Sequence, residues 1–430
     1  MNRVIELFYE VTAIARCSKT HTPFIEYMKT FAQKTGYICY VDEVNNILCK
    51  KDHSNAKICL QGHYDIVCLV DNTIPEIIEE DGFLKAKNST LGADNGIACA
   101  YMLNLMENGF DLEYLFTSDE EIGLIGANGV TFDLQSTYML NIDSEEEGEI
   151  CIGCAGGIDI FAKHQDKKII KNDLNLDLYK ISLKKLPGGH SGINIHEEIP
   201  NAIKLIAKTI KESNALLLDI NGGERINSIP ANVSAIIATN TKPLSSHENM
   251  EITKIDAKSE HLNVYSPQII DFLYSFAHGV RAYDNDLKVV LNSINLAIIK
   301  TDIDEIKIEL SARSMDNAEL KRIVDETLVT LDCFGFETRT SGKYPAWKPQ
   351  QNDFSKNILE IYKNHEKETS LEAIHAGLEC AIFKDKYPNM QIASIGPNIF
   401  NPHSYKERVE IQSVLKVERV LMDIIDKYNT

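Results

Sequence analysis

Apolar, β-prone runs alternate along this chain with amphipathic segments of helical length, and this alternation constrains the fold more than any other feature. Strands are expected at 57–62, 113–117 and 138–142, and helices at 3–16, 23–36, 95–108 and 121–129. Buried strands joined by helices form mostly parallel sheets with helices on both faces. The N-terminal third of the chain therefore predicts an α/β domain of this kind.

The pattern changes after about residue 176 and returns after about residue 345. Strand-like runs such as YKISLKKL, SAIIATNT and KIELSARS dominate the middle, with helices expected at 199–213 and 317–332. The C-terminal part again predicts a long helix at 354–365, a strand in QIASIG and a closing helix at 411–428. The simplest organisation is one α/β domain of residues 1–176 and 345–430, with a smaller α+β domain, residues 177–344, inserted into it.

The charge balance limits the partners of the chain. Its 430 residues carry 63 acidic against 44 basic side chains, a net charge of −19. Such a surplus repels nucleic-acid phosphates and anionic lipid head groups, so we expect neither nucleic acid nor membrane as a partner, but a small molecule. Glu6 and Glu10 interrupt what would be the apolar core of a signal peptide, so a cytoplasmic location is expected.

The ten cysteines are too dilute for a disulfide scaffold, and most stand in apolar runs. We expect reduced, buried thiols. Cys151 and Cys154 have the spacing of a redox or zinc pair, but the context favours core packing. A redox protein that uses these two thiols is nevertheless one alternative function.

Side chains that can bind metal follow the ends of the predicted strands. They are His63 and Asp65, Glu120 and Glu121, Asp143 and His403, and Asp94 lies in a glycine-flanked turn that opens a helix. The carboxyl ends of parallel strands line the ligand crevice of an open α/β sheet, so these groups are expected to converge. Taken singly, each is as well explained as a turn or helix-capping residue.

A cluster of this kind needs positive charge, because neighbouring carboxylates cannot all ionise without it. Two divalent metal ions would supply that charge. Imidazole and carboxylate ligands together point to zinc first, with manganese or cobalt as alternatives.

Several motifs, in order along nearly the whole chain, resemble the aminoacyl-histidine dipeptidases. This is a branch of the dinuclear zinc peptidase family that also contains carnosinases, aminoacylases and glutamate carboxypeptidase. The matching segments are GHYD (62–65), TLGADNG (90–96), DEEIGLIGA (119–127), NIDSEEEGEICIGCAGG (141–157), GGHSGINIH (188–196), HAGLECAIF (375–383) and NPHSYKERVEI (401–411). The resemblance implies a zinc-exopeptidase-like catalytic domain with an inserted lid domain that can form a homodimer.

The resemblance also implies roles for single residues in the first domain. Asp94 would bridge two zinc ions, with His63 and Asp143 completing one site and Glu121 and His403 the other. Asp65 would orient the ring of His63. Glu120 would be the general base.

In the lid, the resemblance makes His190 the group that stabilises the oxyanion, and it makes Asn227, Arg313 and Gly377 substrate-binding residues. Turn capping and surface ion pairing remain alternatives for these positions. The implied reaction is hydrolysis of dipeptides, with Xaa-His substrates foremost. A deacylase or tripeptidase of the same family, and a peptide-binding protein that has lost catalysis, are the alternative functions.

Overall fold

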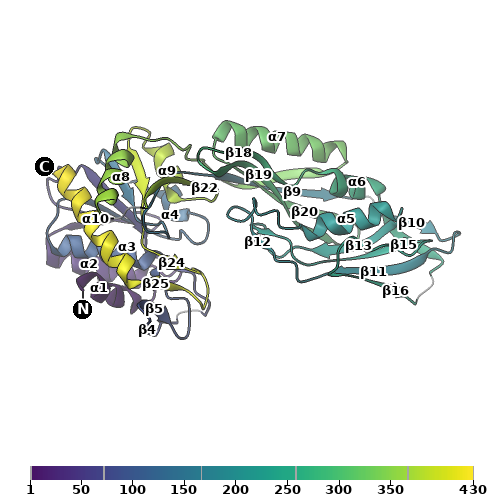
Figure 1. Ribbon diagram of the computed structural model, residues 1–430, viewed down its shortest axis with the longest axis horizontal. Coiled ribbons are helices and arrows are strands. Elements are labelled where there is room, and N and C mark those ends of the chain that lie inside the picture. Colours follow the sequence, from purple (N-terminus) through teal and green to yellow (C-terminus); the bar gives the residue numbers. More distant parts are fainter. Residues whose placement is uncertain (1, 71–72, 166, 257–258, 366–367, 430) are drawn as a thin grey trace. The chain divides into compact units, whose positions relative to one another are not determined.

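The computed structural model describes residues 2–70, 73–165, 167–256, 259–365 and 368–429. The chain forms two compact units (Figure 1). The first contains residues 1–154, 347–373 and 378–430, and the second contains residues 155–346 and 374–377. Each unit has its own apolar core.

The first unit is built on an eight-stranded sheet with the order β1-β2-β6-β3-β7-β23-β8-β22. The strands are β1 (Ile38–Val41), β2 (Ile47–Lys50), β3 (Ile58–His63), β6 (Glu113–Thr117), β7 (Tyr138–Asn141), β8 (Glu149–Cys154), β22 (Ser370–Ile374) and β23 (Gln391–Ser394). β3 runs parallel to β6 and β7, and β7 runs parallel to β23, so the centre of the sheet is parallel. Every residue of β3 and β6 is buried, which shows that both faces of the sheet are covered.

The helices of the first unit are α1 (Arg3–Thr12), α2 (Thr22–Thr35), α3 (Ala93–Glu107), α4 (Ile125–Gly129), α8 (Asp353–His365), α9 (Glu379–Lys386) and α10 (Ile411–Asn429). A smaller sheet contains β4 (Ile77–Glu80), β5 (Phe83–Ala86), β24 (Ile399–Phe400) and β25 (Arg408–Glu410). The predicted helix at 121–129 is shorter in the structure. Residues 119–124 form a turn instead, in which the backbone N–H of Leu124 donates to the carbonyl of Glu120.

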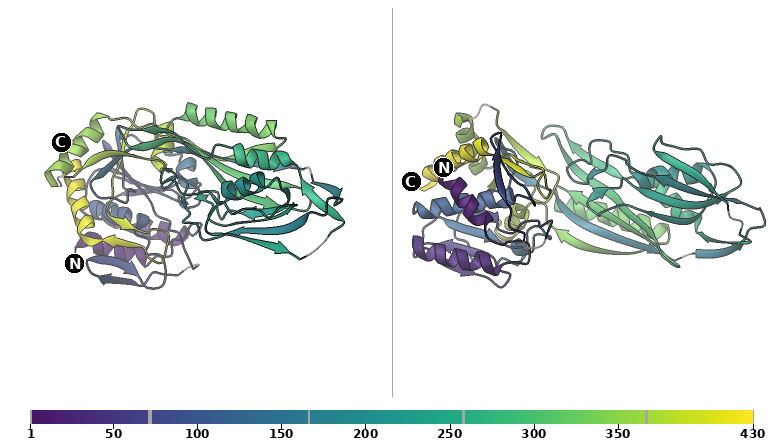
Figure 2. Two further views of the ribbon diagram at one scale, coloured as in Figure 1. Left: turned by 45° about the vertical axis from the view of Figure 1, so that its right-hand side comes forward. Right: turned by 90° about the horizontal axis from the view of Figure 1, so that it is seen from below.

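The second unit is an antiparallel sheet with helices (Figure 2). Residues of the sheet and of three helices form its apolar core. Its main strands are β9 (Gly156–His164), β11 (Asp177–Leu183), β13 (Leu216–Gly222), β15 (Val233–Thr239), β16 (Met250–Ile255), β18 (Gly279–Asp284), β19 (Val289–Thr301), β20 (Ile306–Ser314) and β21 (Glu337–Tyr344). The short strands are β10 (Lys167–Lys171), β12 (Gly189–His190), β14 (Ser228–Ile229) and β17 (His261–Tyr265), and the helices are α5 (Ala202–Glu212), α6 (Pro267–Ser275) and α7 (Asn317–Cys333).

The boundaries between the two units differ from those expected at 176 and 345. β9 pairs with β20 and β21 along its length, so residues 155–176 belong with the second unit. Residues 374–377 join the second unit as well. The alternation of apolar residues in β9 identifies a strand but does not reveal its pairing partner, which is why the sequence placed it in the first domain.

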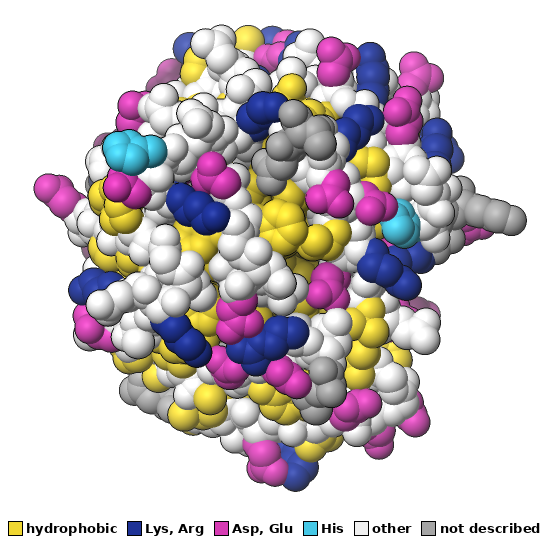
Figure 3. Space-filling model, turned by 90° about the vertical axis from the view of Figure 1, so that its left-hand side faces the viewer, with side chains coloured by type: hydrophobic (Ala, Val, Ile, Leu, Met, Phe, Trp, Pro, Cys, Tyr) yellow, Lys and Arg dark blue, Asp and Glu magenta, His cyan; other side chains and the backbone are white. Residues whose placement is uncertain are grey.

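The face of the molecule in Figure 3 carries Lys and Arg side chains interspersed with Asp and Glu. A continuous basic surface, of the kind that phosphate backbones bind, is not presented on that face. Among the described residues, no helix has both the length and the apolar character needed to cross a membrane.

Candidate active site

The predicted site residues of the first unit stand at one edge of its sheet. His63 is the last residue of β3, Glu120 and Glu121 follow the end of β6, and Asp143 follows the end of β7. The parallel register pairs His63 with the last residue of β6, so these chain ends lie side by side. The structure thus brings these side chains together at one edge of the sheet, as expected from their positions after strand ends.

Asp94 lies between two histidines. Its Oδ1 is 3.1 Å from Nε2 of His63, and its Oδ2 is 3.0 Å from Nε2 of His403. Asp143 Oδ1 is 3.4 Å from the same nitrogen of His63, and Glu121 Oε2 is 2.9 Å from that of His403. The five predicted ligands thus form two groups that share one carboxylate.

The electrostatics of this cluster show how strongly it needs positive charge. Burial and the negative charge of Asp94 raise the pKa of Glu121 to about 7. Burial opposes a charged imidazole at His403, but hydrogen bonds to Asp94 and Glu121 outweigh it and raise the pKa of His403 to about 11. In the metal-free protein, the protonated imidazole of His403 therefore supplies positive charge between the carboxylates.

The donor set fits divalent cations in that place. Ligand atoms of His63, Asp94 and Glu121 all lie within 4.8 Å of one another. Glu121 Oε1 is buried and finds no hydrogen-bond partner among the described residues, although buried carboxylate oxygens are normally satisfied. Mixed imidazole and carboxylate ligands suit zinc, manganese or cobalt.

Asp65 is fully buried behind the cluster and connects several of its parts. Its Oδ1 is 3.5 Å from Nδ1 of His63, and its carboxylate accepts hydrogen bonds from the hydroxyl of Ser18 (2.8 Å) and the backbone N–H of Glu120 (3.0 Å). The N–H of Glu121 points to the same carboxylate at 3.4 Å. Asp65 therefore holds both the ring of His63 and the turn that carries Glu120 and Glu121, the arrangement expected behind a metal-binding histidine.

Glu120 has the environment expected of a proton carrier. Burial raises the pKa of Glu120 well above its ordinary value. The negative charges of Glu121 and Asp143 raise it further, while the positive charge of His63 lowers it. A carboxyl group whose pKa is raised by burial and neighbouring charges is typical of general acid–base catalysis.

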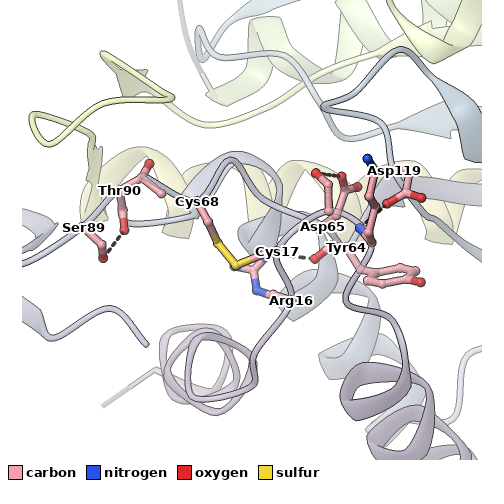
Figure 4. Close-up of a disulfide and its surroundings, with 10 residues drawn as sticks. Arg16, Cys17, Tyr64, Asp65, Cys68, Ser89, Thr90 and Asp119 are labelled. Carbon is pink, nitrogen blue, oxygen red and sulfur yellow. Dashed lines mark hydrogen bonds between the residues drawn. A yellow bond between two sulfur atoms is a disulfide. The ribbon is translucent and has the colours of Figure 1, made fainter. Parts of the chain in front are cut away.

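A disulfide joins Cys17 to Cys68 behind this site (Figure 4). It fixes the segment after α1 against the loop after β3. The backbones of Cys17 and Ile66 also pair there as an isolated parallel β-bridge. Two residues further on, the backbone N–H of Lys19 donates to Asp119 at 2.6 Å, directly before the Glu120 turn.

This disulfide corrects the expectation that all cysteines are reduced. The pairing could not be found from sequence, because spacing does not determine which cysteines meet. Cys151 and Cys154 are buried in β8, as expected for core residues, and burial raises the pKa of Cys154 to about 12.

The predicted lid residues all lie in the second unit. His190, in β12, accepts hydrogen bonds at Nδ1 from the backbone N–H groups of Gly192 (3.3 Å) and Ile193 (3.2 Å). The carbonyl of Asn227 accepts from Ser191 at 2.8 Å, which places Asn227 beside this turn. The geometry agrees with a histidine held in one orientation.

Arg313 and Gly377 meet at Tyr344, a residue that sequence reasoning missed. Arg313 is 7% exposed, and its Nη1 donates to the Tyr344 hydroxyl at 2.7 Å. A Cβ at Gly377 would lie 2.9 Å from the Tyr344 ring, so this position has no room for a side chain. The substrate-binding roles of Arg313 and Gly377 stay predictions.

The chain belongs to the peptidase family M20/M25/M40, whose model matches residues 59–427, and it is thus a hydrolase that acts on peptide bonds.

Among particular relatives, the chain is 32% identical over 457 residues to the cytosol non-specific dipeptidase of Escherichia coli (strain K12), covering 95% of this chain and 94% of that protein. The structure of aminoacylhistidine dipeptidase from Vibrio alginolyticus is similar with a TM-score of 0.83 and 27% identity, over 99% of this chain and 96% of that one. Human carnosine dipeptidase 1 shares the fold with a TM-score of 0.52 and 12% identity, over 98% and 96% of the two chains.

Proposed function

We propose that this chain is a metal-dependent dipeptidase that cleaves the amide bond of dipeptides, with Xaa-His dipeptides as preferred substrates and broader tolerance beyond them. The observation that carries the proposal is the position of Asp94, with one carboxylate oxygen toward each of two histidines. The similarity to the cytosol non-specific and aminoacylhistidine dipeptidases supports the substrate class.

The proposed cofactors are two divalent metal ions per chain, zinc first and manganese or cobalt as alternatives. His63, Asp94 and Asp143 would hold one ion, and Asp94, Glu121 and His403 the other. When bound, such ions polarise a carbonyl oxygen and lower the pKa of water.

Glu120 is the proposed general base. It accepts the proton of the attacking water and returns that proton to the leaving amine. Asp65 keeps the ring of His63 in place through its backbone carbonyl, 3.0 Å from Nδ1, with its carboxylate 3.5 Å from the same nitrogen. It keeps the Glu120 turn in place by accepting a hydrogen bond from the N–H of Glu120.

The second unit supplies the groups that recognise the substrate in this proposal. His190 donates a hydrogen bond to the oxyanion that develops at the scissile carbonyl, because its Nδ1 already accepts from the backbone and leaves Nε2 as the proton-bearing nitrogen. Arg313 pairs with the terminal carboxylate of the dipeptide, and Asn227 and Gly377 contact its backbone.

A substrate panel on protein of known metal content tests the activity. Dipeptides with histidine second should be cleaved with the highest kcat/KM. N-acetyl amino acids should react roughly a hundredfold more slowly, because the clustered carboxylates of the site favour a substrate with a charged amino group, and N-acetylation removes that charge. Faster cleavage of N-acetyl amino acids or of tripeptides would contradict the dipeptidase assignment and support a deacylase or a tripeptidase.

We further propose a homodimer formed through the second unit. β16 and β21 end the strand order of its main sheet among the described residues, and such edges offer backbone groups to another chain. Sedimentation analysis at several protein concentrations tests this.

For location we propose the cytoplasm, in line with the cytosolic relative, and fractionation of the source cells tests it.

A further inference from the structure

Glu407 accepts hydrogen bonds from a whole turn of backbone. The carboxylate is buried, with the residue only 2% exposed, and it faces the segment from Thr90 to Asp94 that leads into α3. Its partners are the backbone N–H groups of Leu91 (2.7 Å), Gly92 (2.9 Å), Ala93 (2.8 Å) and Asp94 (3.3 Å), together with the Thr90 hydroxyl. These are donors at the start of a helix that have no partner within the helix itself.

Arg16 holds the same turn by its carbonyl groups. Its Nη2 donates to the carbonyl of Gly92 at 2.6 Å, and its Nη1 donates to the carbonyl of Tyr64 at 3.0 Å. Gly92 has a φ of +71°, and a Cβ there would lie 2.9 Å from Arg16 Nη2. The turn that presents Asp94 is therefore fixed by an anion on its N–H side and a cation on its carbonyl side.

Glu407 also belongs to the segment that presents His403. The chain turns sharply there, since His403 has a φ of 58°, and the N–H of Glu407 donates to the carbonyl of Ser404 at 3.1 Å. The Glu407 carboxylate thus connects the turn of Asp94 to the turn of His403. Asp94 Oδ2 and His403 Nε2 are 3.0 Å apart.

We infer that Glu407 is a positioning residue for the metal centre: its carboxylate sets the placement of Asp94 against His403 and thereby the affinity and geometry of metal binding. This inference rests on the proposed metal site. Charged acceptors form the stronger hydrogen bonds to backbone N–H groups, and a glutamine would place its own N–H₂ group against several of these donors.

The test compares Glu407→Gln and Glu407→Asp with the wild type and with the matched control Glu410→Gln. The Glu410 carboxylate lies on the same segment but accepts from Asn398 at 2.7 Å instead. Zn²⁺ affinity is measured by competition with a chromophoric chelator, and ligand geometry by the visible absorption spectrum of the Co²⁺-loaded protein. Melting of the metal-free proteins reports stability separately.

We expect Glu407→Gln to weaken Zn²⁺ binding about 10- to 100-fold and to change the Co²⁺ spectrum, as loss of a residue behind metal ligands does elsewhere. Glu407→Asp, which keeps the charge, should lie between Gln and wild type, and Glu410→Gln should match the wild type. A Glu407→Gln protein with lowered melting temperature but wild-type affinity and spectrum would overturn the inference and leave Glu407 a purely structural residue.

If the Gln variant does not fold, the Asp variant decides alone, and wild-type Zn²⁺ affinity in it would equally overturn the inference. Failure of the proposed function gives a different result. In that case the wild type itself binds fewer than two ions or cleaves no dipeptide, whatever the Glu407 variants do.

Discussion

Asp94 and Glu120 have different proposed tasks in the site. Asp94 faces both histidines and takes part in both proposed metal sites, whereas Glu120 stands in a turn fixed through its backbone N–H by Asp65. The two neighbouring acids of this motif therefore have different surroundings, because Glu121 lies beside His403 while burial raises the pKa of Glu120.

Replacing Glu120 by glutamine should abolish most turnover without removing metal. We expect kcat to fall by about 10²–10⁴-fold, the usual contribution of general acid–base catalysis. Steady-state kinetics on an Xaa-His dipeptide, with elemental analysis of the same preparation, measures both effects. The base assignment is wrong if Glu120→Gln retains near wild-type kcat, or if its activity loss merely follows lost metal.

Residues with a sequence motif and residues without one differ in how they act. The sequence identifies His63, Asp94 and Asp143 as candidate metal ligands, because metal ligands belong to few residue types and these three stand at strand ends or in a turn. Glu407, Arg16 and Tyr344 could not be identified in this way, because they act through backbone carbonyl and N–H groups or through one other side chain, and such contacts leave no pattern in a single sequence.

At the scale of elements, the positions of most helices and strands could be predicted from hydrophobic periodicity. β3, α3, β6 and α8 lie within a few residues of their predicted bounds. Three helices, α1, α4 and α5, are shorter than predicted. Pairing across long sequence separations, as in β9 with β20 and β21, requires the folded chain.

The disulfide between Cys17 and Cys68 links the segment after α1 to the loop after β3. It closes a loop with a sequence separation of 51 residues. Removing it with the double substitution Cys17→Ser and Cys68→Ser should lower the free energy of unfolding of the first unit by about 2–4 kcal/mol, since the unfolded chain gains freedom. Denaturant unfolding followed by fluorescence of the single tryptophan, Trp347, which is buried in this unit, measures the change.

Substituting the exposed Cys333 by serine provides the control, and it should leave the unfolding midpoint unchanged. Oxidised wild type and the double variant unfolding at the same denaturant concentration would show that the disulfide does not stabilise the unit. After thiol reduction the wild type should unfold at the same denaturant concentration as the double variant, because reduction opens the same cross-link.

At the scale of the whole molecule, metal binding should couple to stability and pH. In the folded, metal-free protein the pKa of Glu121 is about 7, above its ordinary value of 4.5. Protonated Glu121 therefore stabilises the fold at low pH, and this stabilisation is lost as the pH rises from 4.5 to about 7. The stabilisation by protonated His403 is likewise lost as the pH rises from 6.5 to about 11. Metal ions compete with these protons and should bind more tightly as pH rises.

The stabilisation by Zn²⁺ should therefore be larger at about pH 8 than at about pH 6. Calorimetric melting of one preparation, with and without Zn²⁺ at each pH, measures it. Buried His278 and His375, whose pKa values burial lowers to about 4 and about 3, favour the fold at higher pH, but their effect is common to both forms and cancels in the difference. A larger effect of Zn²⁺ at pH 6 would contradict the proposed ligand set.

The most direct test of the central claim is a metal titration of chelator-treated protein with an Xaa-His dipeptide as substrate. The account predicts an inactive metal-free protein whose activity returns with added Zn²⁺ and reaches a plateau at two ions per chain, because Asp94 belongs to both sites. Full activity without metal, or a plateau at one ion per chain, would contradict it.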